Sequence, residues 1–412
     1  MSYFFNLTYA RVLSLLIFIP AFFSLRKKND TTSFGRTLPD KALIAYLLLT
    51  AILCFREGNI TSGTGIVNNQ TLTNSLREIF YLFIDIFLPY FVISRSLKNF
   101  QSIRDAILSL AFAIMVLAPL ALFESLKGWL LYSSLSRVFE LGGGMGGYQA
   151  RDGVLRALVT AGHSIALGYL MVVGIGLYLF LQSSIQQKFI RRFGMALLVA
   201  GLIVPVARGP WIGSIVLLVV FILTGRNSLQ RLMILAMMAI ISVSLISIFP
   251  GGERVINLLP FIGSTNIDSI NYRERLLTNS MIVIQHDPWF GSIDYLDAPE
   301  MQSMRQGEGI IDLVNTYIWV ALDKGLVGLG LFVNFFALTL FGIFQAMRSI
   351  PDRDSEEYLL GRVLLATLLA ILVIIYTVSS ITVVPIVYWS FASLGVAYAQ
   401  MIKKQSRMSN GG

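Results

Sequence analysis

The sequence is poor in the residues that build disulfides and metal centres. A single cysteine, Cys54, and two histidines, His163 and His286, stand among 412 residues. One cysteine cannot form an intrachain disulfide, and a zinc site usually needs about three or four His, Cys or carboxylate ligands. The composition therefore excludes a disulfide-rich secreted scaffold and argues against a zinc enzyme.

Charge is also scarce. Only 13% of the residues are Asp, Glu, Lys or Arg, against roughly 25% in soluble domains, and 55% are hydrophobic. So few charges do not cover the surface of an ordinary soluble enzyme, and this composition also excludes disorder and a coiled coil. The net charge of +9 fits the Lys and Arg that collect in short cytoplasmic loops better than it fits a nucleic-acid-binding surface.

Long apolar runs are what the sequence does contain. A helix needs about 20 mostly apolar residues to cross the hydrocarbon, and helices satisfy their own backbone groups there. We predict an all-α, polytopic transmembrane helical bundle of about eleven spans. The predicted spans are residues 3–25, 41–56, 79–94, 106–125, 157–182, 193–207, 209–225, 232–249, 326–346, 359–378 and 381–402.

Basic residues in the short connections predict the orientation of these spans. Clusters such as 26–28, 188–192 and 403–407 should face the cytoplasm, which puts the C-terminus inside and, with eleven spans, the N-terminus outside. The organisation we predict is spans one to eight with an outer loop in the first part, one large periplasmic loop, and then three spans with a cytoplasmic tail. The corresponding ranges are 1–249 with the loop 126–156, then 250–311, then 312–412.

Arg208 lies between two apolar runs, in the sequence Val206-Ala-Arg-Gly-Pro-Trp211. Ionisable residues at such positions are costly and mark functional sites by default. An interfacial arginine that reaches lipid headgroups is the plainer alternative. We favour function, because the Gly-Pro break frees backbone N–H groups beside a guanidinium, and together they suit an anionic oxygen.

Two further groups of cations flank the predicted spans on the outer side. Arg273 and Arg275 begin a short amphipathic helix predicted over 273–284 in the large loop; they could clamp a phosphate, although locally a solvated face is the simpler reading. Arg151 and Arg156 precede the fifth span, where they could bind a ligand or anchor at the interface. His163 follows in that span; a lone histidine there is more often a packing residue than a catalyst, and we name it only as a candidate for substrate binding.

Polar residues also precede the ninth span. Asp312 and Asn315 are three apart, so on a helix they would share a face, with Tyr317 close by. A carboxylate there could accept a proton from a hydroxyl. Considered alone, a polar first helical turn capped by Asp312 is the simpler interpretation.

Four motifs follow one another along residues 148–345. The first is an arginine followed by a His-containing turn, and the second is an Arg-Gly-x-Trp break between two spans. The third is an arginine fifteen residues before Pro-x-x-Gly, and the fourth is an Asn-x-Tyr run before Gly-x-x-Gly. In this sequence they are Arg156 with Gly162–Ile165, Ala207–Trp211, Arg273 with Pro288–Gly291, and Val314–Ile318 with Gly325 and Gly328.

This order resembles the bacterial O-antigen ligase and polysaccharide polymerase family of membrane glycosyltransferases. One position departs from the ligases, which have a histidine, regarded as the candidate general base, where this sequence has Val314. The departure is more typical of polymerase-like members, in which a Val-Asn-Ser/Thr-Tyr run is familiar. Asp312 is then the nearest carboxylate that could act as a base.

The resemblance implies a donor glycan on undecaprenyl pyrophosphate in the outer leaflet of the bacterial inner membrane, with the active site facing the periplasm. Its sugar would pass to a hydroxyl of a glycan or lipid-linked acceptor, without a metal, nucleotide or flavin cofactor. Arg208 and Arg273 would hold the pyrophosphate, with Arg156 or Arg275 assisting. Membrane lipids and a chain-length regulator or flippase are the further partners implied, and nucleic acid is not.

Three alternatives remain at this point. A ligase would move preformed polymer onto lipid A core or onto a protein. A lipid-linked oligosaccharide flippase or transporter would line a translocation path with the same cations, which the large outer loop disfavours. A non-catalytic membrane scaffold would have no need of Arg208 within the membrane.

Overall fold

The structure is a computed structural model that describes most of the chain. Its helices overlap the apolar runs of the sequence, whereas its short strands were not predicted. The described residues are 8–27, 34–56, 59–61, 67–69, 71–134, 147–151, 153–248, 267–306, 309–381 and 383–410.

Helices dominate the fold, as the sequence predicts. The first group is α1 (Tyr9–Lys27), α2 (Leu38–Leu53), α3 (Leu72–Leu82), the π-helical turn Phe83–Phe87, α4 (Leu88–Ser96), α5 (Phe100–Lys127), α7 (Ser164–Leu181), α8 (Lys188–Ile203), α9 (Arg208–Leu223) and α10 (Ser228–Ile248). The second group is α12 (Ile267–His286), α13 (Pro299–Gln302), α14 (Thr316–Arg348), α15 (Glu356–Ile375) and α16 (Val384–Asn410). Short 3₁₀ turns lie at Val159–Ala161, Gln182–Ser184 and Tyr295–Asp297.

Two small antiparallel hairpins accompany the helices. Strands β1 (Asn59–Thr61) and β2 (Val67–Asn69) pair with Asn59 opposite Asn69. Strands β3 (Ala150–Arg151) and β4 (Val154–Leu155) pair with Ala150 opposite Leu155. Both hairpins are too short to form a layer of their own, so the fold class is all-α.

Each of the eleven predicted spans contains a helix. Among the described residues, five helices are long and apolar enough to cross a membrane, namely α5, α7 with its final turn, α10, α14 and α15. The shorter α9 is also apolar. The chain is thus a multi-pass membrane protein, and the count of eleven crossings stays a prediction.

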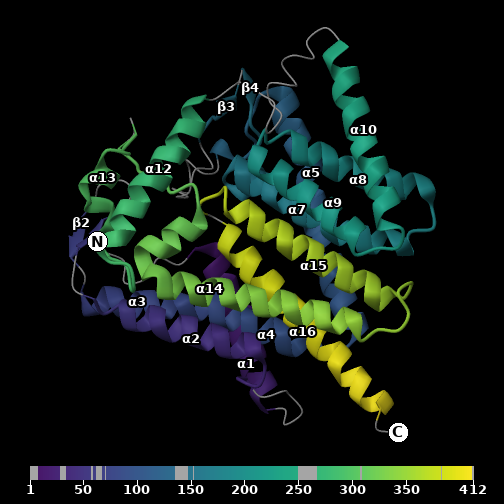
Figure 1. Cartoon of the computed structure of the whole chain (residues 1–412), viewed down its shortest axis with the longest axis horizontal. Helices are drawn as coiled ribbons and strands as arrows, with labels where there is room; N and C mark the ends of the chain where they lie inside the picture. The colour runs from purple at the N-terminus through teal and green to yellow at the C-terminus, as the bar shows by residue number, and fades with distance from the viewer. Residues whose placement is uncertain are drawn as a thin grey trace.

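Helix α7 forms the centre of the bundle. Almost all of its residues are buried, and its glycines allow neighbouring helices to approach closely. Gly174 lies against Ile114 of α5, and Gly176 against Thr367 of α15. By contrast, α10 lies at the edge of the bundle and buries none of its apolar window, as expected of a helix that faces lipid (Figure 1).

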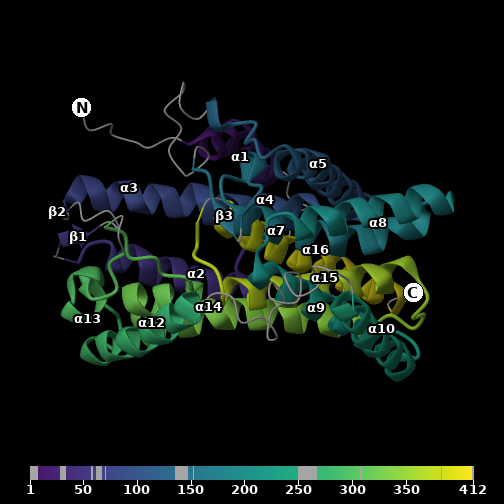
Figure 2. The same cartoon turned by 90° about the horizontal axis from the view of Figure 1, so that it is seen from above.

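The helices run between two ends of the bundle. At the first, which we call the tail end, Arg104 pairs with Glu356 at 3.7 Å and Arg226 with Asp354 at 3.7 Å, which gathers cations predicted to be cytoplasmic. At the other, the loop end, lie α12, α13 and the β1–β2 hairpin, while the C-terminus lies at the tail end (Figures 1 and 2). The predicted inner and outer residues are therefore separated in space.

Helix α14 begins earlier than predicted. The side chain of Asn315 accepts hydrogen bonds from the backbone N–H groups of Tyr317 (2.9 Å) and Ile318 (3.3 Å) and caps the helix. Asp312 lies before this cap, outside any helix or strand. The expectation that Asp312 and Asn315 share a helical face, or that Asp312 is the cap, is therefore wrong.

Helix α12 is longer than the predicted 273–284 segment, and its apolar face differs in part. The sequence puts four apolar residues on one side of this helix, Leu276, Leu277, Met281 and Ile284. Leu276 and Ile284 are buried as this pattern predicts, together with Val283. Leu277 and Met281 are 44% and 49% exposed instead. The buried positions fall at helical spacing and pack α12 against α13 and the start of α14.

Candidate functional site

The connection after α15 is the place at the loop end where separate elements meet. Ser379 Oγ donates to Asp312 Oδ1 at 2.7 Å, and the guanidinium of Arg273 donates to the Thr377 carbonyl at 3.4 Å. Thr316, the first residue of α14, donates to the carbonyl of Val378 at 2.9 Å. These bonds join α12 and the start of α14 to one short stretch of backbone, residues 377–380.

Helix α9 begins beside the same stretch, with Arg208 at its first position. The helix follows a tight connection from α8 in which Val206 adopts a φ of +48°. The next residue, Gly209, packs so closely on Thr377 that a Cβ atom would overlap the Thr377 hydroxyl. Arg208 and Arg273, 65 positions apart in sequence, therefore flank Thr377.

The electrostatics agree with this placement. The pKa of Arg273 lies below its ordinary value. The main cause is desolvation of the guanidinium by surrounding protein atoms, although part of the side chain is exposed. The nearby positive charge of Arg208 lowers this pKa further. Asp312 acts in the opposite direction and raises this pKa. Arg208, Arg273 and Asp312 thus lie within electrostatic reach of one another, and their charges sum to a net positive charge.

The segment before α7 adds Arg156 and His163. Arg156 Nε donates to the Pro205 carbonyl at 3.0 Å, which fastens it to the α8–α9 connection. His163 caps α7, since its Nδ1 accepts from the backbone N–H of Ile165 at 3.2 Å. Burial and Arg156 lower the pKa of His163, whereas Asp312 raises it, so these three side chains lie within electrostatic reach of one another.

A buried carboxylate holds this segment in place. Glu124 of α5 is 1% exposed, and its two oxygens accept backbone N–H groups from Leu131 (3.1 Å), Leu158 (3.0 Å) and Val159 (2.9 Å). Val159 has a φ of +49°, a conformation that needs such support. Glu124 therefore fixes the backbone between Arg156 and His163.

Tyr272 ties Asp312 to α12. Its hydroxyl donates to the Asp312 carbonyl at 3.0 Å and accepts from the Asp312 N–H at 3.1 Å. Burial raises the pKa of Tyr272, which keeps the hydroxyl protonated and able to donate. The residue beside Arg273 thus sets the backbone position of Asp312.

Five predicted site residues therefore gather at the loop end: Arg156, His163, Arg208, Arg273 and Asp312. Others serve the fold. Asn315 is the α14 cap, and the Tyr317 hydroxyl donates to the Leu372 carbonyl at 2.9 Å. Val314 packs among apolar residues next to α12. Arg151 lies in β3, and its side chain is outside the described residues.

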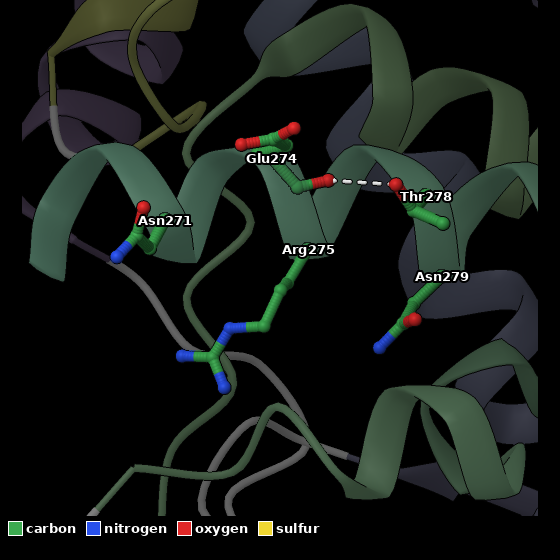
Figure 3. Close-up of a pocket in the computed structure, with 5 residues that line it drawn as sticks. All are labelled: Asn271, Glu274, Arg275, Thr278 and Asn279. Carbon is green, nitrogen blue, oxygen red and sulfur yellow. Dashed lines mark hydrogen bonds between the residues drawn. The ribbon is translucent and has the colours of Figure 1, made fainter.

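Arg275 lies apart from this group. It lines an open groove of about 740 Å³ together with four other polar residues of α12, namely Asn271, Glu274, Thr278 and Asn279. Figure 3 shows Asn271, Arg275 and Asn279 projecting to the same side of the helix, as their spacing of four requires. Two residues along a helix are about 200° apart, so Arg275 projects away from the side on which Arg273 meets Thr377.

A second charged cluster lies where α2 approaches the break in α14. Arg56 pairs with Asp323 at 3.4 Å, and Asp323 also pairs with Lys324, whose ammonium lies 4.6 Å from the centre of the Trp319 ring. Asp323 thus pairs with both cations of this cluster. Across the described ranges, no group of three His, Cys, Asp or Glu side chains is placed to hold a metal ion.

Sequence reasoning missed the residues that position the site. Glu124 had a visible signal, a lone carboxylate inside an apolar run. Thr377, Ser379 and Tyr272 had none, because ordinary polar residues at the end of a span or in a loop carry no local mark of their partners. Arg56 is the last residue of a predicted span, and the sequence analysis did not single it out.

The comparisons with known proteins agree with this picture. Residues 193–333, about a third of the chain, match the family described as O-Antigen ligase. The match covers Arg208, Arg273 and Asp312 and ends within α14. No curated protein matches the chain. The match suggests a glycosyltransferase-type enzyme, and this protein is a multi-pass membrane protein whose residues 193–333 are similar to the O-antigen ligase family.

Proposed function

We propose that this protein transfers a glycan from undecaprenyl pyrophosphate to a hydroxyl of a second glycan, at the periplasmic face of the bacterial inner membrane. The single observation that carries the proposal is the meeting of Arg208 and Arg273 around Thr377. Arg208 adds a second positive charge close to Arg273, and Asp312 is the carboxylate near it. An anionic group that enters between the two arginines would complete the site.

The chemistry needs this positive charge. The acceptor oxygen forms a bond to the anomeric carbon of the donor sugar, while the bond from that carbon to the phosphate oxygen breaks. The bonding electrons leave with the lipid pyrophosphate, and the proton of the acceptor hydroxyl goes to a base. Charge grows on the leaving oxygens, where fixed guanidinium groups stabilise it most.

Arg208 and Arg273 hold the pyrophosphate in this scheme, and Arg156 assists. Arg275 projects from another side of α12 and is replaced in the assisting role by Arg156 (Figure 3). Guanidinium groups suit the task because they stay protonated and bind phosphate through paired, planar hydrogen bonds.

Asp312 is the base in this scheme. Its Oδ1 accepts a hydrogen bond from Ser379, and its backbone is fixed by Tyr272, so the carboxylate is oriented next to the cations. His163 lies within electrostatic reach of it, and its lowered pKa keeps the ring neutral at neutral pH. Val314 cannot accept a proton, which supports a polymerase-like member over a ligase.

Transfer by the purified protein in lipid vesicles tests the proposal. With an undecaprenyl-pyrophosphate-linked repeat unit as both donor and acceptor, we expect longer glycans and free lipid pyrophosphate. Arg208→Lys and Arg273→Lys should both be impaired if paired hydrogen bonds matter, whereas Arg353→Lys at the tail end should not. Full activity in both Lys variants would leave only a point-charge role, and full activity in both Ala variants would refute the site.

The ligase is the second candidate, and the description of the matched family favours it. A ligase would move preformed polymer to lipid A core and would not lengthen repeat units. Offering the protein both acceptors in separate reactions distinguishes the two. The positions of Arg208 and Arg273 serve either reaction, since the leaving group is the same.

A further inference from the structure

Helix α14 contains a break that another part of the chain fills. Gly325 has a φ of +67° and a ψ of −175°, outside the helical region. In a continuous helix the N–H groups of Leu326 and Val327 would donate to carbonyls four residues earlier. Here they donate to the carbonyls of Pro288 (2.8 Å) and Trp289 (3.2 Å). The turn that follows α12 thus occupies the place of the interrupted helical bonds.

The carbonyls released by the break also find partners. The Leu322 carbonyl accepts from the N–H of Ser292 at 3.0 Å. The Asp323 carbonyl accepts from the guanidinium of Arg56 at 2.7 Å. Because unpaired backbone groups away from water are costly, this exchange of partners is what allows α14 to break at this point.

The turn after α12 and the break in α14 form a contact that we call the joint. Arg56 binds both of its segments. One of its terminal nitrogens donates to the carbonyls of Phe290 (3.0 Å) and Gly291 (2.9 Å), and the other reaches Asp323. Its Nε donates to the Leu53 carbonyl at 3.0 Å, which fastens the joint to the end of α2. A planar guanidinium can make all of these bonds at once, and an ammonium cannot.

The joint is too tight for side chains. Gly291, like Gly325, has a φ of +67°, and a Cβ atom on either glycine would overlap the backbone of the other segment. The Pro-x-x-Gly and Gly-x-x-Gly motifs of the sequence therefore meet in space. Gly291 and Gly325 allow the two backbones to touch.

The joint lies at one end of a pair of packed segments. Helix α12 and the first part of α14 enclose a small apolar cluster that includes Leu276, Ile284 and Leu322. Tyr272 fastens the other end of the pair, through its two bonds to the Asp312 backbone. Arg273 lies on one segment and Asp312 precedes the other, so a change at the joint alters their relative position.

We propose that Arg56 is a positioning residue for glycan transfer. It fastens the turn after α12 into the break of α14 and so fixes Arg273 relative to Asp312, without touching the substrate. The activity part of this inference rests on the proposed function; the joint itself does not. A displacement of about 1 Å at a reacting group can cost up to about 100-fold in rate, so a loosened joint should be measurable.

The conservative variant Arg56→Lys keeps the charge opposite Asp323 and removes the multiple bonds to carbonyls. In the vesicle assay we expect its kcat to fall roughly tenfold, with KM for the lipid-linked donor within about twofold of wild type. Arg77→Lys is the matched control, since Arg77 lies on the neighbouring helix α3 and donates a hydrogen bond to Asn74 of the same helix. An unchanged kcat for Arg56→Lys overturns the proposal.

A second measurement does not depend on activity. Spin labels at Leu277 of α12 and at Tyr376 after α15, both exposed, report the distance across the site in a Cys54→Ser background. We expect Arg56→Lys to broaden or shift this distance distribution, and Arg77→Lys to leave it unchanged. Identical distributions overturn the positioning role. If the wild type transfers no glycan, the proposed function fails, while this measurement still decides whether Arg56 fixes α12.

Discussion

Two arginines of this protein, Arg95 and Arg273, have opposite surroundings. The Arg95 side chain is fully buried and donates to Asp40 and Ser94, each at 2.5 Å, with the Phe34 ring 5.3 Å away. Arg273 is partly exposed, has Arg208 for a neighbour, and makes one long hydrogen bond to a backbone carbonyl within the described part of the chain. The first arginine has its partners within the fold, whereas the second is available to an anion from outside.

The difference separates structural from functional charge in a chain where both lie in apolar surroundings. Asp40 has its own further partners, because it accepts from the Tyr90 hydroxyl at 2.7 Å and caps α2 together with Thr37. A buried pair of this kind is destabilising once one member is lost. A pair of like charges, as at Thr377, is instead relieved when an anion binds between them.

The largest effect is expected at Arg95. Arg95→Ala leaves the Asp40 carboxylate buried without its cation, which should cost about 3–5 kcal/mol of stability. We expect little folded protein in detergent, read as the amount of monodisperse material and its thermal midpoint. The double variant Asp40→Asn/Arg95→Met, which removes both charges, should recover part of the loss. A single variant as stable as wild type would contradict the structural role.

The next largest effect is on activity. Arg273→Ala and Arg208→Ala each remove one cation from the proposed binding site of the leaving group, and we expect transfer to fall about 100- to 1,000-fold. The thermal midpoint should stay near that of wild type, or rise slightly because the repulsion between the two arginines is gone. Arg353→Ala at the tail end is the control. If the amount of folded protein fell together with the activity, these arginines would have a structural role like that of Arg95.

The sequence predicted the individual members of the site better than their meeting. Arg208 was visible because a charge between two apolar runs is costly, and Arg273 because of its spacing before Pro288. Their approach depends on Thr377, which belongs to a different helix connection, and nothing in a helical period encodes contacts over that distance. The break at Gly325 had a local signal only in its glycine.

The errors have physical causes as well. Asp312 and Asn315 look like one helical face in sequence, but an asparagine with extended backbone caps a helix well, and α14 begins after it. Arg275 looked equivalent to Arg273, although residues two positions apart on a helix face different directions. Glu124 accepts hydrogen bonds from three backbone N–H groups, and no pattern in its own segment reveals these donors.

A smaller effect should follow from crowding the backbone stretch 377–380 without changing a charge. Gly209→Ala places a methyl group against the Thr377 hydroxyl and pushes the Arg273 acceptor away from Arg208. We expect transfer to fall roughly tenfold, since a sub-ångström shift acts only indirectly on the leaving group. Thr377→Ala in the same chain removes the overlapping oxygen and should restore most of the rate. A double variant no better than the single one would show that the overlap is not the cause.

The smallest effect is a shift in pH dependence. Burial and Arg156 lower the pKa of His163, so the neutral ring that caps α7 is favoured in the folded protein. Its contribution to stability is complete above the ordinary pKa of about 6.5 and declines as the pH falls from there toward the lowered folded value. If transfer needs the neutral ring, its acid limb should have a midpoint below about 6.5. Arg156→Gln removes the repulsion and should move that midpoint upward. Arg275→Gln, on the far side of α12, should leave the midpoint unchanged. If Arg156→Gln also left the acid limb unchanged, His163 would have no part in the reaction.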